Sequence, residues 1–259
     1  MKNLFLDKNT TIAIIGFGRF GQLLVKVLLK HSKANLTLVT SKKTTLSHKN
    51  LAVASIKKLR EADVIIPCVP ISSFESVIKQ IAPLIKKGAV IVDVCSVKIL
   101  PVQIMKKHLP NSVQIIASHP MFGPDSFRIK KSLQGLRLVL GNITAKKSVY
   151  LQTRSFFKNL GLTIIELSPA QHDKYMAHTL GYSYLVGKIA QKMGIKKTPI
   201  DTYDFELLLE HVGIVKSDSD QLFLDMQTKN PFAKDVQAKY QQTTVNLLKE
   251  IESAKLGYS

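Results

Sequence analysis

The sequence contains no tryptophan and only two cysteines, Cys68 and Cys95. Both come at the ends of predicted buried strands, where a thiol packs as a small apolar side chain, so we expect free core residues rather than a disulfide. No spacing of Cys and His fits a metal site, so no metal is expected. The sequence also lacks any run of about 18 apolar residues, so no membrane-spanning helix is predicted. Asp7 and Lys8 interrupt the first apolar patch, which argues against a signal peptide and makes the cytoplasm the expected location.

Acidic residues are also scarce: 18 Asp and Glu stand against 37 Lys and Arg, which gives a formal charge of +19. Such an excess favours anionic partners, among them nucleic acid, membrane surfaces, and small phosphates and carboxylates. The lysines, however, are scattered in pairs such as Lys86-Lys87 and Lys106-Lys107, without a long basic run or interleaved aromatic residues. We therefore expect a solvated basic surface with no specific nucleic-acid partner and no membrane partner, because charge alone supplies only non-specific binding.

The order of the predicted elements divides the 259 residues into two parts. Up to Glu166, short β-branched runs alternate with helical patterns, which is typical of a doubly wound α/β fold of the Rossmann type. After Glu166 only helical periodicity remains. The sequence thus predicts an N-terminal Rossmann domain, residues 1–166, and a C-terminal all-helical domain, residues 167–259. The second part is too thin to bury all its apolar faces alone, so we expect it to form a homodimer.

A glycine-rich motif follows the first predicted strand, Thr11–Ile15, and opens a helix. In this G-x-G-x-x-G pattern, Gly16 permits the tight turn out of the strand, and Gly18 lets a pyrophosphate approach the backbone. Gly21 lets the helix pack close to the strand, and the helix N-terminus offers free N–H groups to the anion. The unit predicts dinucleotide binding. Its expected contact residues are Gly16, Phe17, Gly18, Arg19, Phe20 and Gly21.

The end of the second predicted strand, residues 36–39, bears on the choice of cofactor. An acidic residue there would bind a ribose hydroxyl. The chain instead has Thr40, Ser41, Lys42 and Lys43, whose hydroxyl and ammonium groups can meet a phosphate dianion. We therefore predict NADP rather than NAD, the alternative being that the two lysines only solvate a loop. Later strand exits are expected to complete the cofactor site with Cys68, Val69, Pro70 and Ser96.

His119 follows a predicted strand, residues 113–117, and precedes a loop that is rich in proline and glycine. A strand end followed by a rigid loop is where an α/β protein presents a catalytic side chain, and an imidazole titrates near neutral pH. Ser96 follows a neighbouring predicted strand, residues 89–94. Both side chains are therefore expected at the carboxyl edge of one sheet. The alternative is a histidine whose hydrogen bonds are satisfied within a tight turn.

Four segments together carry a family resemblance: Asp93-Val94-Cys95-Ser96-Val97-Lys98, Ser118-His119-Pro120-Met121-Phe122-Gly123-Pro124-Asp125-Ser126, His172-Asp173 and Ala177-His178-Thr179. In these segments the chain resembles the prephenate/arogenate dehydrogenases of tyrosine biosynthesis, from Thr11 to about Phe232. The block that begins at His119 and the residues from Thr40 to Lys43 are similar to the plant-type, NADP-using arogenate dehydrogenases.

The resemblance implies an oxidoreductase that couples hydride transfer to NADP with loss of carbon dioxide from a cyclohexadienol, arogenate or prephenate. It implies that His119 is the general base for the ring hydroxyl and that Ser96 bonds this hydroxyl or orients the imidazole. The substrate contacts that it implies are His119, Lys98, Met121, Gly123 and His178. Lys98 would balance a substrate carboxylate, unless it is a solvated loop lysine. His172 and Asp173 belong either to the site or to the structure of a helix start, where Asp173 favours the helix dipole.

One departure from the family pattern bears on the substrate. Many prephenate-using members carry an arginine for a substrate carboxylate in the helical part, and residues 203–224 here contain no arginine. This favours arogenate, whose side chain carries an amine, and leaves open another substrate of similar shape. Two further readings stay open at this point. One is another NADP-dependent Rossmann dehydrogenase or reductase with a helical dimer domain; the other is a non-catalytic nucleotide sensor.

Overall fold

The computed structural model describes residues 4–256. The chain divides into two compact units, Met1–His172 and Asp173–Ser259. This division falls after His172 rather than after Glu166, because the first turn of helix α6 (Pro169–Met176) belongs to the first unit.

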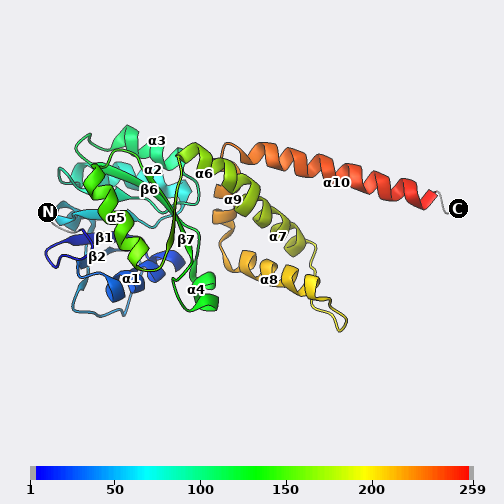
Figure 1. Ribbon diagram of the computed structural model, residues 1–259, viewed down its shortest axis with the longest axis horizontal. Coiled ribbons are helices and arrows are strands. Elements are labelled where there is room, and N and C mark those ends of the chain that lie inside the picture. The colour runs from blue at the N-terminus through cyan, green and yellow to red at the C-terminus, as the bar shows by residue number, and fades with distance from the viewer. Residues whose placement is uncertain (1–3, 257–259) are drawn as a thin grey trace. The chain divides into compact units, whose positions relative to one another are not determined.

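One sheet organises the first unit. Its strands are β1 (Thr11–Ile15), β2 (Asn35–Val39), β3 (Leu51–Val53), β4 (Val64–Pro67), β5 (Val90–Val92), β6 (Gln114–Pro120), β7 (Arg137–Asn142) and β8 (Thr163–Glu166). Their order is β3-β2-β1-β4-β5-β6-β7-β8, and every neighbouring pair is parallel except β6 with β7 (Figure 1). The central strands are continuous apolar runs because helices cover both faces of the sheet. The predicted doubly wound α/β fold is confirmed.

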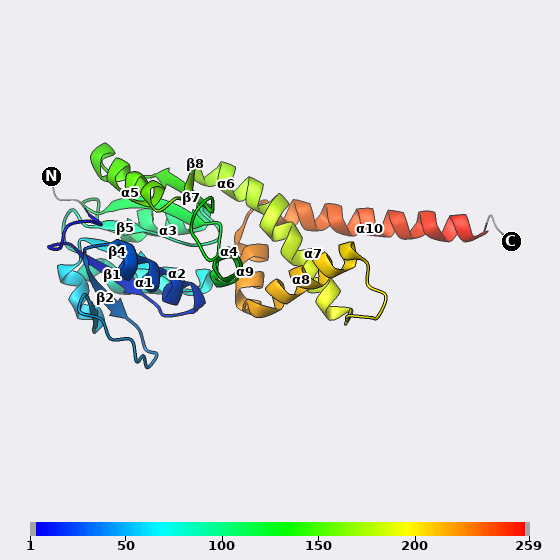
Figure 2. The ribbon, with the colours of Figure 1, turned by 60° about the horizontal axis from the view of Figure 1, so that its bottom comes forward.

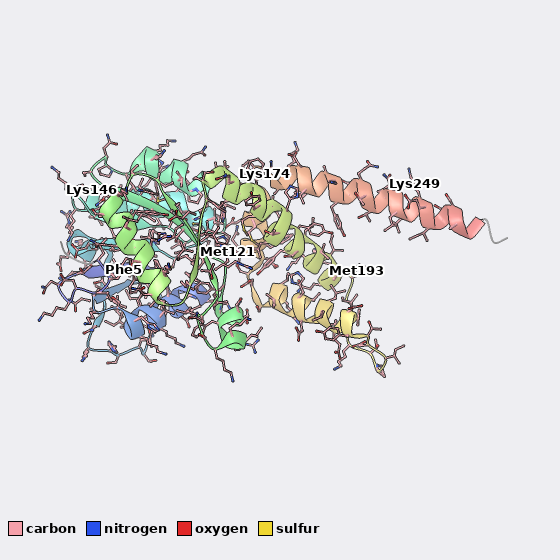
Figure 3. All side chains as sticks on the ribbon, viewed as in Figure 1. Phe5, Met121, Lys146, Lys174, Met193 and Lys249 are labelled. Atoms are coloured by element: carbon pink, nitrogen blue, oxygen red, sulfur yellow. The ribbon has the colours of Figure 1, made fainter. Side chains whose placement is uncertain are left out.

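Two apolar layers hold the helices against this sheet. On one face, α1 (Arg19–His31) and α5 (Lys147–Asn159) pack with the N-terminal Phe5, whose ring stacks on Phe156 with centroids 4.4 Å apart (Figure 3). On the other face lie α2 (Ile71–Ile81) and α3 (Ile99–His108). Short elements complete the unit: the 3₁₀ helices Ile56–Glu61 and Ala82–Leu84, and α4 (Pro124–Lys130).

The predicted loop that carries His119 is wrong in one respect. His119 and Pro120 are the last two residues of β6, where His119 lies opposite Val139 of β7. The antiparallel pairing with β7 extends the strand beyond Ala117, where the apolar run ends. Residues 121–123 lie outside helix and strand, as expected of a loop. Pro124 then begins α4, since proline at a first helical position loses no hydrogen bond.

The second unit is all-helical, as predicted. After α6 come the π-helical turn Ala177–Gly181, α7 (Tyr182–Lys192), α8 (Tyr203–Ser217), α9 (Asp220–Lys229) and α10 (Ala233–Leu256) (Figure 2). Its buried apolar cluster is small and contains Tyr184, Val215 and Met226. Helix α10 exposes several large apolar side chains, namely Val245, Leu247, Leu248 and Ile251. The homodimer stays a prediction.

Among residues 4–256, no helix is both long and apolar enough to cross a membrane. The cytoplasmic location stays a prediction.

Candidate active site

The glycine motif forms a tight junction between β1, β4 and α1. Gly16 has a φ of +99°, and a Cβ there would lie 2.4 Å from the carbonyl oxygen of Cys68. A Cβ on Gly21 would lie 2.5 Å from the carbonyl oxygen of Gly16. A Cβ on Gly18 would instead meet no described atom within 4 Å. Two glycines thus allow the backbone to cross at close range, and the third leaves the space above the loop open for a ligand.

The N-terminus of α1 suits an anion. Gly18 is the N-cap and provides no side-chain cap, and the first turn carries no acidic residue. The backbone N–H groups of this turn therefore remain available to a pyrophosphate. The first residue of the helix, Arg19, has its guanidinium 2.6 Å from the carboxylate of Asp125 in α4. The side chain of Arg19, a predicted cofactor contact, is thus paired with the segment that follows His119.

A cavity of about 660 Å³ opens beside this loop and the end of β2. It is lined by Phe17, Gln22, Lys26, Lys43, Thr44, Thr45 and Leu46. Lys26 comes from α1 and Lys43 from the segment after β2, so two ammonium groups meet in one cavity. The sequence had indicated Lys43 but not Lys26, which is visible only once α1 is placed beside β2. Thr40 instead closes a turn, because its hydroxyl accepts the backbone N–H of Lys42 at 3.0 Å.

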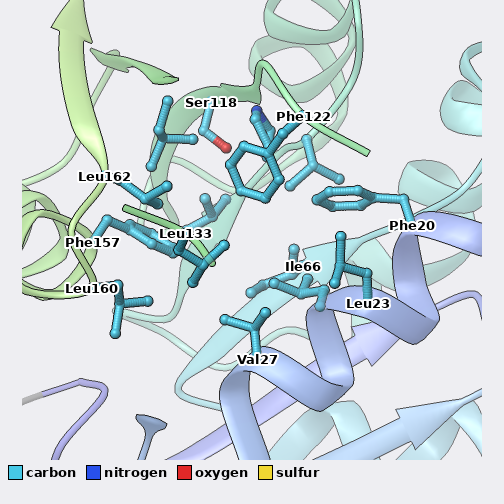
Figure 4. A pocket seen from close by; sticks show the side chains of 15 residues that line it. Phe20, Leu23, Val27, Ile66, Ser118, Phe122, Leu133, Phe157, Leu160 and Leu162 are labelled. Atoms are coloured by element: carbon cyan, nitrogen blue, oxygen red, sulfur yellow. The ribbon is translucent and has the colours of Figure 1, made fainter. Parts of the chain in front are cut away.

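A second, enclosed cavity lies between the sheet and the helices α1 and α5 (Figure 4). Its free volume is about 30 Å³ and its lining is almost entirely apolar. This is about the space of one water molecule, and an apolar space of that size stays dry. Phe20 lines this cavity with Leu23 and Phe157, so part of its surface belongs to the core below the nucleotide loop.

His119 is buried, with 5% of its surface exposed, and is paired with a second histidine. Its Nδ1 lies 2.9 Å from Nε2 of His172, which is 1% exposed, and the two rings meet edge to face. Burial lowers the pKa of His119 well below its ordinary value of 6.5, and the neighbouring His172 and Lys98 lower it further. The expectation of a near-neutral pKa is therefore wrong, because the strand position removes the imidazole from water. The ring is neutral at pH 7, which is the form that a general base requires.

A buried ion pair joins the two strand ends beside this histidine. The ammonium of Lys98 contacts the carboxylate of Asp93 and donates to the carbonyl oxygen of Ser118 at 2.6 Å. Asp93 also accepts the backbone N–H groups of Cys95 and Ser118, at 3.0 and 3.2 Å. The alternative of a solvated loop lysine is wrong, since only 2% of the Lys98 side chain is exposed. The contact of Lys98 with a substrate carboxylate stays a prediction. The charge of Lys98 balances Asp93, and the pair ties the Ser96 segment after β5 to the strand that carries His119.

The other predicted site residues lie at the same sheet edge. Ser96 is half-buried between β5 and α3, and its hydroxyl bonds to no residue that the structure describes. Met121, in the segment between β6 and α4 (Figure 3), donates its N–H to the carbonyl of Arg137 at 2.9 Å. Gly123 is the N-cap of α4. Cys68 and Val69 lie between β4 and α2, and Pro70 is the N-cap of α2. Both thiols of the chain are free, as expected for core residues.

His178 belongs to the second unit, where it is exposed within the π-helical turn. Such turns are rare and frequently occur at functional sites. Gln227 of α9 donates to the carbonyl oxygen of Gly181 at 2.7 Å, at the end of this turn. The role of His178 as a substrate contact stays a prediction.

A known protein family matches the region that contains the strand of His119. The family model of the prephenate dehydrogenase nucleotide-binding domain matches residues 30–161, just over half of the chain. Arogenate dehydrogenase 2, chloroplastic, from Arabidopsis thaliana is 31% identical over 256 residues, which covers 93% of this chain and 69% of that protein. The chain belongs to the prephenate/arogenate dehydrogenase family. The predicted family is thus confirmed.

Other members of the prephenate/arogenate dehydrogenase family match over most of this chain. Arogenate dehydrogenase 1, chloroplastic, from Arabidopsis thaliana is 28% identical, over 95% of this chain but only 40% of that protein. The crystal structure of prephenate dehydrogenase from A. aeolicus, in complex with hydroxyphenyl propionate and NAD+, superposes with a TM-score of 0.73 at 17% identity, covering 95% of this chain and 91% of that one. Residues 189–254 also match a TYRAAT1-like C-terminal domain. Membership supports a dehydrogenase of tyrosine biosynthesis that uses a nicotinamide dinucleotide.

Proposed function

We propose that this protein oxidises and decarboxylates arogenate, with prephenate as the alternative substrate, and that NADP is its hydride acceptor. The observation that supports this most directly is the state of His119: a neutral, buried imidazole that His172 holds at Nδ1. The ion pair of Lys98 and Asp93 joins the strand of His119 to the segment that contains Ser96. A base in its unprotonated form is what the reaction requires of the protein.

The bound dinucleotide would supply the acceptor for the hydride that leaves the ring carbon bearing the hydroxyl. His119 accepts the proton of this ring hydroxyl at Nε2, the nitrogen that faces away from His172. As the proton leaves, the oxygen becomes a carbonyl and the ring loses hydride. Breakage of the bond to carbon dioxide then moves an electron pair into the ring and gives the aromatic phenolate, which takes the proton back from His119 to form the phenol. The Ser96 hydroxyl orients the substrate hydroxyl or the imidazole. General-base assistance of this kind is worth roughly two to four powers of ten in rate.

The residues of the cofactor site support the proposal of NADP as the cofactor. Gly16 and Gly21 hold the backbone turn that brings the N-terminus of α1 to the pyrophosphate. Lys26 and Lys43 line one cavity at the end of β2, and two ammonium groups there favour the extra phosphate of NADP. We therefore expect Lys43→Ala to weaken NADP about tenfold and to leave NAD affinity unchanged. Isothermal titration with both dinucleotides tests this, and Lys30→Ala is the matched control, because Lys30 is an exposed lysine of α1 outside the cavity lining.

The substrate preference rests on the second unit. Residues 203–224 contain no arginine to hold the carboxylate of a keto-acid side chain. This favours arogenate. Two relatives named above are arogenate dehydrogenases, which agrees with the preference.

The test of the function is NADPH or NADH formation, followed by absorbance, with each of the two substrates and each of the two cofactors. We expect turnover with arogenate and NADP. His119→Asn should lower kcat by a factor of about 10² to 10⁴ without changing the affinity for NADP. His31→Asn is the control, because His31 is exposed at the end of α1. Absence of turnover with all four pairs, or full activity of His119→Asn, would refute the proposal.

We also propose that the protein is a homodimer through its second unit. The exposed apolar side chains of α10 would be buried in an interface with a second copy of the chain. Sedimentation equilibrium should give twice the chain mass, and Leu248→Glu should shift this toward the monomer. A monomeric mass of the wild-type protein at all concentrations would exclude the homodimer.

A further inference from the structure

The contact between His119 and His172 determines which ring nitrogen of His119 carries the proton. We propose that His172 is a positioning residue that holds His119 in the tautomer with a proton on Nδ1 and a lone pair on Nε2. This inference rests on the proposed role of His119 as the general base. It assigns a function to His172, for which the sequence alone left a structural role open.

The geometry allows two arrangements of one proton. The two ring nitrogens lie 2.9 Å apart, which is a hydrogen-bond distance, so one of them donates and the other accepts. If His172 Nε2 donates, His119 must carry its own proton on Nε2 and cannot accept another there. If His119 Nδ1 donates, the lone pair of its Nε2 is available. Only the second arrangement produces a base, so His172 Nε2 must be the acceptor.

The same contact survives the reaction. When His119 takes a proton at Nε2, its Nδ1–H still donates to His172, and no partner has to rotate. The developing imidazolium thus keeps an acceptor in a place from which water is largely excluded, since His119 and His172 are almost completely buried. A buried imidazolium without such a partner would cost more to form. His172 therefore favours both the correct starting form and the protonated product.

The fold places His172 with two local devices. Ser168 and Gln171 form a capping box: the Ser168 N–H donates to the Gln171 side chain at 3.1 Å, and the Gln171 N–H donates to the Ser168 hydroxyl at 3.3 Å. This fixes the start of α6, and His172 lies in its first turn with its N–H on the Ser168 carbonyl. Gly141 of β7 provides the approach, because a Cβ there would lie 2.9 Å from the carbonyl oxygen of Leu167. The chain before α6 therefore passes against β7, which pairs with the strand of His119.

The experiment combines a spectroscopic readout with kinetics on the full chain. In the wild-type protein, the ¹⁵N shifts of the imidazole should show His119 as the Nδ1–H tautomer. His172→Leu removes the acceptor, and we expect a mixture of tautomers and a kcat roughly ten- to a hundredfold lower, the range seen when a partner that orients an imidazole is lost at a metal site. The Kd for NADP should not change. His172→Gln offers an amide oxygen near the former position of Nε2 and should recover most of kcat and of the Nδ1–H signal.

The controls separate this inference from the function on which it rests. His108→Leu removes a histidine at the end of α3 that pairs with Glu75 of α2, and it should change neither kcat nor the tautomer of His119. If wild-type His119 carries its proton on Nε2, or if His172→Leu keeps kcat within a factor of two, the positioning role is wrong even when His119→Asn is inactive. If His119→Asn is itself active, the general base is wrong. Should His172→Leu fail to fold, the wild-type tautomer and the His172→Gln variant still decide the question.

Discussion

The buried pair of Lys98 and Asp93 gives the most exacting test of the structure. Replacing Lys98 by Met keeps most of the volume of the side chain and removes its charge. The carboxylate of Asp93, which is completely buried, then loses its cationic partner and keeps only neutral donors such as the N–H groups of Cys95 and Ser118. Removal of one member of a buried pair costs roughly 3–5 kcal/mol, because the other charge stays out of water.

The loss is large relative to the whole stability of a domain, roughly 5–15 kcal/mol. With a urea slope of about 2–3 kcal/mol per molar, the unfolding midpoint of the first unit should fall by roughly 1–2.5 M. Because the chain has two units, the transition is best followed with a probe in the first unit, such as the burial of Cys95 against a thiol reagent.

Two variants make this prediction specific. Lys58→Met breaks an ion pair of Lys58 with Glu61, 2.8 Å long, in which both side chains are more than half exposed, so we expect a cost below about 1 kcal/mol. Combining Asp93→Asn with Lys98→Met leaves no buried charge, so the double variant should be more stable than Lys98→Met alone. If Lys98→Met and Lys58→Met have the same free energy of unfolding within about 0.5 kcal/mol, Lys98 is not buried against Asp93 and the reasoning fails.

Three further predictions follow from the same geometry. Gly16→Ala should lower the melting temperature strongly, since its Cβ would meet the Cys68 carbonyl at 2.4 Å. Gly18→Ala should melt at the temperature of the wild type and bind NADP less tightly. Equal melting temperatures of the two variants would contradict the close approach of the backbone at Gly16 to Cys68. The pKa of His119 is lowered in the folded state, so below about pH 6.5 the imidazole binds more protons in the unfolded chain than in the folded one. The difference in unfolding free energy between the wild type and His119→Asn should therefore shrink as pH falls from about 7 to 5, as measured by urea titration. Burial raises the pKa of Cys95 well above 9, so iodoacetamide should label it only after unfolding, and rapid labelling of the native protein would be inconsistent with its position.

Much of the first unit could be predicted because its signals are local. The β-branched run Thr11–Ile15, the three glycines and the helical pattern after them lie within about twenty residues, and each needs only its neighbours in the chain to make its structure. The capping box of Ser168 and Gln171 is a local signal of the same kind, since it is closed within one helical turn. The helical second unit followed from periodicity alone. The same local pattern did not predict α4, because Pro124 reads equally well as a loop residue and as a first helical residue.

The sequence by itself thus determined the alternation of strands and helices in the first unit, the nucleotide loop and the identity of the histidine at the centre of the candidate site. Only the tertiary structure decided that Lys98 is buried, that His119 ends a strand, and that His172 lies against it. These three facts depend on residues that are far apart in the chain: His119 and His172 are 53 positions apart, and Lys98 and Ser118 are 20 apart. Their meeting depends on the register of β6 with β7 and on the close passage that Gly141 allows. No local pattern encodes such a meeting, because the free energy that favours it comes from burial in the assembled sheet and not from the segment itself.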